Sequence, residues 1–124
     1  MLSKAEMVKA RKAIESLYDG KCTITEHQKV KKENKSTGFQ DVVVHEDVAC
    51  RLSFKSINNT NQTDAASAVV QITKVFLAPE IQVKPGSKLT ITQNDVTTEY
   101  KSSGEPAFYS THQEIVLELF KGWA

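Results

Sequence analysis

The sequence predicts a mostly β protein, a small antiparallel β-barrel or sandwich with an N-terminal α-helix. Apolar residues recur at helical spacing near the N-terminus, whereas from residue 21 onward they alternate with polar residues at the period of a half-buried strand. Clusters of Gly, Pro, Asn, Asp and Ser interrupt this alternation at short intervals. One helix followed by about six or seven short strands packs most simply as a barrel or sandwich with the helix outside.

The first predicted element is a helix of about residues 3–19. Ser3 and Glu6 have the spacing of a capping box, in which the Ser hydroxyl and the Glu carboxylate satisfy backbone donors at a helix start. Gly20 is predicted to end the helix in a left-handed conformation. One face of the helix is apolar and consists of Met7, Ala10, Ile14, Leu17 and Tyr18.

The next segments predict three strands. Cys22 and Ile24 share one face of the first strand, and the polar run 30–38 is predicted to be a solvated hairpin loop that leads into a strand over 39–45. The segment 47–55 shows the strictest alternation in the chain. Its apolar face is expected to point into the core and consists of Val48, Cys50, Leu52 and Phe54.

Segment 56–68 holds Asn, Thr, Gln, Ser and Ala but hardly any large apolar side chain. A polar stretch of this length inside a small domain is unusual and is therefore a candidate for function. A strand is predicted to follow over 69–77 and to end before Pro79, with turns at Pro85-Gly86 and Asn94-Asp95. The last strand is predicted within 108–120, and its alternating apolar residues are Ile115, Leu117 and Leu119.

The 124 residues are predicted to form a single domain, 1–124, with the β structure over about 21–120. The formal charge is +1, with nine Lys/Arg against five Asp/Glu in residues 1–40 and seven against ten in the remainder. A duplex-DNA binder usually carries a denser cationic stripe, so direct DNA recognition is not expected. The sequence lacks a signal-peptide pattern, a CxxC motif and an apolar run of about 20 residues, which predicts a protein of a reducing cytoplasm without a membrane segment.

Residues with catalytic or metal-binding chemistry are few and scattered. His112 with Cys22 or Cys50 would be the minimum pair for covalent acyl transfer, but both cysteines fall on the apolar side of predicted strands, where an inert buried thiol is the usual outcome. His27, His45 and Cys50 lack the short paired spacing of a zinc site. The carboxylates have no evident acid/base partner, and no Gly-rich phosphate loop occurs. The sequence therefore predicts no enzyme activity, no metal and no cofactor.

Two C-terminal stretches carry a resemblance to a known family. The first runs Pro79-Glu80-Ile81-Gln82-Val83-Lys84-Pro85-Gly86-Ser87-Lys88-Leu89, and the second, after Tyr100, runs Pro106-Ala107-Phe108-Tyr109-Ser110-Thr111-His112-Gln113-Glu114-Ile115. They resemble the head-completion proteins of tailed bacteriophages and of prophages of Gram-positive bacteria, minor capsid proteins also called stopper or head-tail connector proteins. The rest of the chain resembles that family by the order of its elements.

The resemblance implies a β-barrel subunit without enzyme activity that forms a ring, often of twelve copies, below the portal and adaptor and above the tail. Its partners would be further copies of itself, the portal-adaptor protein and the tail-completion protein. Genomic DNA would pass through the channel without sequence recognition, and a near-neutral charge suits this because strongly cationic walls would hold the DNA. The protein would lie in the neck of the virion after assembly in the host bacterial cytoplasm.

The same resemblance suggests which residues meet these partners. The polar loop would face the channel, with an ordinary surface loop as the alternative interpretation, and its candidate residues are Lys55, Asn58, Asn59, Asn61 and Gln62. The N-terminal helix and the C-terminal tail are the expected docking elements. Their candidate residues are Arg11, Lys12 and Trp123, of which Trp123 has no predicted core position and suits an interface.

Two other functions remain open at this stage. A tail-completion or tail-terminator protein is also a ring subunit of similar size from the same assembly region. A small β-barrel can also bind single-stranded nucleic acid by stacking bases on aromatic side chains beside basic ones. The aromatic residues of this sequence show no alternation with basic residues, so core packing explains most of them more simply.

Overall fold

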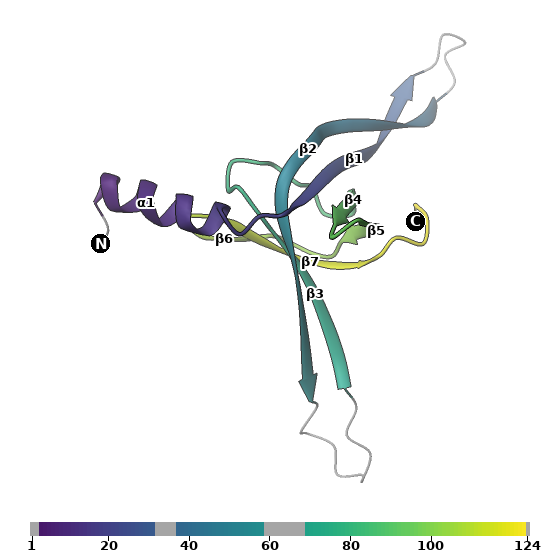
Figure 1. Ribbon diagram of the computed structural model, residues 1–124. Coiled ribbons are helices and arrows are strands. Elements are labelled where there is room, and N and C mark those ends of the chain that lie inside the picture. The colour runs from purple at the N-terminus through teal and green to yellow at the C-terminus, as the bar shows by residue number, and fades with distance from the viewer. Residues whose placement is uncertain (1–2, 32–36, 59–68, 124) are drawn as a thin grey trace.

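The computed structural model describes residues 3–31, 37–58 and 69–123 (Figure 1). In these residues one helix, α1 (Lys4–Glu15), precedes seven strands. The strands are β1 (Gly20–Lys31), β2 (Thr37–Asn58), β3 (Val69–Leu77), β4 (Lys88–Gln93), β5 (Val96–Ser102), β6 (Ala107–Phe108) and β7 (Gln113–Leu119). None of the helical residues that the structure describes forms a stretch long and apolar enough to cross a membrane.

The strands form one antiparallel sheet whose ends meet. The order is β3-β2-β1-β4-β5-β7-β6, and β3 also pairs with β7, so that six of the strands close into a ring while β6 lies beside β7. The closure is irregular, because β5 and β7 pair only over Tyr100–Ser102 and Leu117–Leu119. The mostly β fold with an N-terminal helix is therefore confirmed, as a ring of strands that is less regular than a simple barrel.

The interior of the ring is filled from alternate positions of its strands. Ile24, Val75, Leu77, Ile91 and Ile115 are among the side chains with no exposed surface. The period-two pattern predicts this, because successive side chains of a strand point to opposite faces. The whole core consists of Cys22, Ile24, Cys50, Leu52, Val75, Leu77, Val83, Leu89, Ile91, Tyr100, Ile115 and Leu117.

Strand β2 is bent, and it pairs with β1 along its first part and with β3 along its last part. The register between β1 and β2 shifts twice between Cys22 and Thr25, so β2 contains extra residues at this point. Asp47 has a positive φ of 50° there, a conformation that Asp adopts more readily than most residues. The strands predicted separately over 39–45 and 47–55 are therefore one bulged strand.

Two narrow ribbons extend beyond the ring (Figure 1). We call residues 26–31 with 37–42 the β1–β2 arm, and residues 55–58 with 69–72 the β2–β3 arm. The pairing of β1 with β4 ends at Thr25, and that of β3 with β7 ends at Thr73. Among the described residues each arm is therefore a two-stranded ribbon with both edges free.

The arms explain two errors in the sequence-based prediction. Phe54 was expected in the core but is 55% exposed, because it lies opposite Thr73 at the end of the ring, where the β2–β3 arm begins. Segments 30–31, 37–38 and 56–58 were expected in loops but belong to β1 and β2. Strand pairing extends into these polar segments because the ladder bonds join main-chain groups whatever the side chain.

The prediction for Gly20 was also wrong. Helix α1 is capped at its end by Ser16, which has right-handed dihedral angles, and Gly20 is the first residue of β1. A Cβ atom on Gly20 would lie 3.2 Å from the Cys50 carbonyl oxygen and 3.1 Å from Oε1 of Gln93. The close approach of neighbouring strands, rather than a left-handed turn, favours glycine here.

Other local predictions are confirmed. The Ser3–Glu6 capping box is present. Asn94 and Asp95 have φ values of 53° and 63°, which defines a two-residue hairpin turn of type I′ between β4 and β5. Gly86 has a φ of 86° in the turn after Pro85, where a non-glycine residue would be strained.

Candidate assembly surfaces

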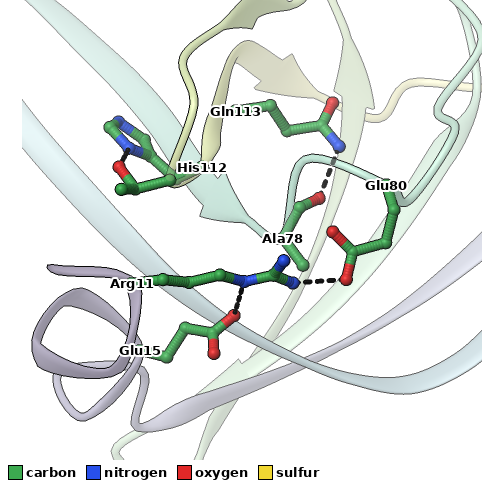
Figure 2. Close-up of polar contacts among 7 residues, drawn as sticks. Arg11, Glu15, Ala78, Glu80, His112 and Gln113 are labelled. Atoms are coloured by element: carbon green, nitrogen blue, oxygen red, sulfur yellow. Dashed lines mark hydrogen bonds and ion pairs between the residues drawn. The ribbon is translucent and has the colours of Figure 1, made fainter. Parts of the chain in front are cut away.

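Helix α1 projects from the sheet and contains no fully buried residue (Figure 1). Its expected apolar face is only half-buried, and Leu17, just beyond the helix, is 57% exposed. Arg11 connects the helix to the turn after β3, because its guanidinium pairs with Glu80 (Figure 2). The same guanidinium pairs with Glu15 of the helix, with 3.1 Å between Nε of Arg11 and Oε2 of Glu15. The ion pair lowers the pKa of the Glu80 carboxyl and raises that of Arg11.

Arg11 was predicted as a docking residue, and the structure shows it engaged within its own chain. Lys12, the other candidate on the helix, is exposed. The sequence analysis missed Glu80, since no local pattern relates it to a helix 69 residues earlier.

The turn that carries Glu80 is fixed by a buried amide. The Gln113 side chain has no exposed surface, and its Nε2 donates to the carbonyl oxygens of Ala78, at 2.8 Å, and Ile81 (Figure 2). Burying the amide costs free energy unless it is hydrogen-bonded, so its two acceptors determine where it can lie. Strand β7 thereby positions the turn after β3, and this turn positions α1.

A groove of about 240 Å³ lies between the end of α1 and the sheet. Arg51 lies on its rim and donates from Nη1 to the Leu17 carbonyl oxygen at 3.0 Å. Phe76 meets the His112 ring edge-on at 5.6 Å, and Tyr109 stacks on the same ring at 4.8 Å. We call this hollow the helix-base groove, and its lining residues are Ile14, Leu17, Tyr18, Arg51, Phe76 and His112.

A second aromatic cluster joins the C-terminal tail to the β1–β2 arm. The His27 ring stacks between Phe39, at 4.6 Å, and Trp123, at 4.8 Å. Nδ1 of His27 lies 2.9 Å from Oδ1 of Asp41, and this contact lowers the pKa of Asp41. Trp123 was predicted as a docking residue, and the structure places it half-buried against its own chain, where it also packs edge-on against Phe120.

Beside this cluster, the free edge of β1 borders a cleft of about 560 Å³. The cleft separates the start of the β1–β2 arm from the turn that contains Pro85 and Gly86, and Trp123 lies at one side. Nζ of Lys84 is 3.8 Å from Oε1 of Glu26 across it. The tail and the arm thus form a surface that no sequence motif indicated, because it depends on the strand register.

The structure describes only part of the predicted channel segment. Lys55 is exposed on the β2–β3 arm, and Asn58 is the last residue of β2. Asn59, Asn61 and Gln62 lie outside the described residues. The channel segment therefore stays a prediction.

The candidate catalytic and metal-binding residues are not brought together. Cys22 and Cys50 are fully buried in the core, whereas His112 contacts Thr111 and Glu114 at the surface. Within residues 3–31, 37–58 and 69–123, no group of three His, Cys, Asp or Glu side chains is arranged to hold a metal ion.

We expect Cys22 to make the fold sensitive to alkaline pH. The contact with Cys50, together with burial, raises the pKa of the Cys22 thiol above its ordinary value of 9.0. The thiol of the unfolded chain ionises above that pH while the folded one stays protonated. The free energy of unfolding should keep its full value below pH 9 and should fall at higher pH by about 1.4 kcal/mol per pH unit.

Urea unfolding between pH 7 and pH 10.5 measures this effect. Cys22→Ala serves as the control, because it should be less stable at every pH but should show a shallower alkaline decline. Parallel declines in the two proteins would contradict the assignment to Cys22.

No family model matches the chain, and no curated protein matches it. A solved structure that shows partial similarity is that of xkdH, a protein of the phage-like element PBSX of Bacillus subtilis. The TM-score is 0.48 and the sequence identity 14%, over 80% of this chain and 91% of that chain. Similarity at this level identifies neither a family nor a function for the present chain.

Proposed function

We propose that this chain is a non-enzymatic structural subunit of the neck of a tailed phage or prophage, a head-completion or stopper protein that joins head and tail as part of a ring. The shape of the subunit carries the proposal. Two narrow ribbons and a helix without a fully buried residue extend from a small core (Figure 1).

Such a shape favours a protein that works in contact with neighbours. An isolated two-stranded ribbon is marginally stable in water, and its free edges can pair with other chains. Large apolar side chains are exposed on or beside the arms, since Phe39 of the β1–β2 arm is 63% exposed and Phe54 at the base of the β2–β3 arm is 55% exposed. Neighbouring copies in a ring would cover these edges and side chains.

The two stretches that resemble head-completion proteins form one structural unit, which adds support. The stretch 79–89 contains the turn after β3 and leads into β4, and the stretch 106–115 contains β6 and the start of β7. Gln113 of the second stretch donates to the carbonyl oxygen of Ile81 in the first. The resemblance therefore falls on residues that position helix α1 rather than on unrelated surface turns.

In the proposed ring, α1 and the C-terminal tail meet the portal-adaptor protein and the tail-completion protein. The predicted channel residues line the channel, through which DNA passes without sequence recognition, and they are Lys55, Asn58, Asn59, Asn61 and Gln62. Twelve copies are proposed, as in the family that the sequence resembles. The subunit is a virion protein that assembles in the host cytoplasm.

Electron microscopy of particles from the phage or prophage that encodes this chain tests the proposal. Deleting the gene should yield separate heads and tails, with heads that lose their DNA, and the intact gene supplied in trans should restore joined particles. An antibody against the chain should label the neck of isolated heads. Label on isolated tails would instead identify a tail-terminator protein, and normal joining without the gene would remove the neck function altogether.

A further inference from the structure

The helix-base groove has apolar walls that no described part of the chain covers. Ile14 and Tyr18 are half-buried on its walls, and Leu17 on its rim is 57% exposed. The apolar surface continues past His112 to Tyr109, which stacks on the His112 ring and is 51% exposed. A contiguous apolar surface of this kind on a small protein marks an interaction site more often than an isolated exposed residue does.

The polar groups of the groove that are free are hydrogen-bond donors. Arg51 donates one N–H to the Leu17 carbonyl oxygen, but it forms no ion pair with any described residue, and a guanidinium carries five N–H groups. The Tyr18 hydroxyl has no hydrogen-bond partner in the described chain, but it is itself buried and is therefore not accessible to a ligand in the groove. The nearby carboxylate of Glu114 is already engaged, with Nε2 of His112 at 2.9 Å and Nζ of Lys74 at 3.5 Å.

We propose that the helix-base groove binds a segment of a partner protein that carries a large apolar side chain next to an Asp or Glu. The apolar side chain packs between Phe76 and Ile14, and the carboxylate accepts hydrogen bonds from the Arg51 guanidinium. A volume of about 240 Å³ suits one large side chain rather than a folded element. The proposal goes beyond the neck assignment, because it requires only a protein partner.

The charge of the groove favours this partner over a nucleic acid. A phosphate backbone is bound by several Lys or Arg side chains together. Among the described residues that line the groove, Arg51 is the single Lys or Arg, and it lies beside apolar walls, which matches one carboxylate next to one apolar anchor.

Solution NMR of the isotope-labelled chain, titrated with short peptides, tests the proposal. The probe is an acetylated and amidated peptide with Phe and Leu flanked by Asp, and the control peptide has Lys in place of each Asp. The Asp peptide should give saturable shifts at Ile14, Leu17 and Phe76. The Lys peptide should bind at least about tenfold more weakly, since a hydrogen bond between charged groups is lost.

Three variants separate binding from folding. Arg51→Gln removes the charge but supplies an amide N–H that can donate to the Leu17 carbonyl oxygen. This variant should bind the Asp peptide about tenfold more weakly. Leu17→Asp should abolish binding, whereas Leu119→Asp, at a site that is 59% exposed, should leave it unchanged.

Several results would overturn the proposal. These are the absence of localised shifts at millimolar peptide, equal binding of the Asp and Lys peptides, and equal losses from Leu17→Asp and Leu119→Asp. Shifts of the same groove signals with protein concentration, in the absence of peptide, would show that a second copy of the chain fills the groove instead.

Discussion

Replacing Leu52 by alanine is expected to lower the free energy of unfolding by about 2–5 kcal/mol. The Leu52 side chain is 9% exposed and belongs to the core cluster. Truncation to alanine therefore removes buried apolar surface and also leaves a cavity. The main-chain N–H of Leu52 donates to Oε1 of Gln93 at 2.8 Å, and this bond is available to alanine as well. The loss should therefore reflect packing alone, measured by urea unfolding with circular dichroism.

Phe54→Ala is the matched control, two residues along the same strand. Sequence alternation places Leu52 and Phe54 on one face, but Phe54 is 55% exposed at the base of the β2–β3 arm. Its replacement should change the free energy of unfolding by less than about 1 kcal/mol. Equal losses at the two positions would mean that the arm packs back onto the core in solution.

Replacing Gln113 by leucine is expected to cost about 1–3 kcal/mol, although the volume of the side chain is nearly kept. The substitution leaves the carbonyl oxygen of Ile81 without its Gln113 donor, and Ala78 keeps only the bond from the Ile81 N–H at 3.2 Å. Oε1 of Gln113 is itself buried without a partner in the described chain, so removing it recovers part of the loss. The two donated bonds should outweigh that single unpartnered acceptor.

Gln113→Glu gives an independent readout of the same contact. An ionised carboxylate would face two carbonyl oxygens in a buried site, so burial and repulsion should raise its pKa in the folded state. When the pKa of the introduced carboxyl is higher in the folded than in the unfolded chain, the free energy of unfolding has its full value below about pH 4. It falls as the pH rises through the folded-state pKa. Urea unfolding should show a smaller loss at pH 4, where the protonated carboxyl can still donate one of the two bonds, and a much larger loss at pH 7. A loss of the same size at both pH values would show that the side chain at this position does not face the two carbonyl oxygens in a buried site.

The ring strands could be predicted from the sequence because their pattern is local. Apolar residues at every second position share one face of a strand, and this face is buried. Cys22 and Ile24 follow this pattern in β1, and Cys50 and Leu52 follow it in β2. The hairpin turn at Asn94-Asp95 follows from side chains that accept positive φ, and the helix start from the Ser3–Glu6 capping box. None of these features needs information from a distant part of the chain.

The positions at which alternating apolar residues stop being buried could not be predicted from the sequence. An apolar residue at an alternating position is buried only where another layer covers it, and Phe54 lies beyond that point. Leu119 also continues an apolar alternation and is 59% exposed at the end of β7. A strand leaves the ring where its neighbour on one side ends. The pairing between strands decides this point, and the sequence of a single strand does not contain it.

The amino-acid sequence alone determined the class of the fold, the position of the helix and the faces of the strands inside the ring, because each rests on residues within a few positions of one another. Only the tertiary structure placed Arg11 on Glu80, Gln113 on the Ala78–Ile81 turn and Arg51 beside Leu17. These contacts join residues 32 to 69 positions apart in the chain. Strand register places Arg51 in β2 and Gln113 in β7, and a shift of either strand by one residue would turn these side chains to the opposite face.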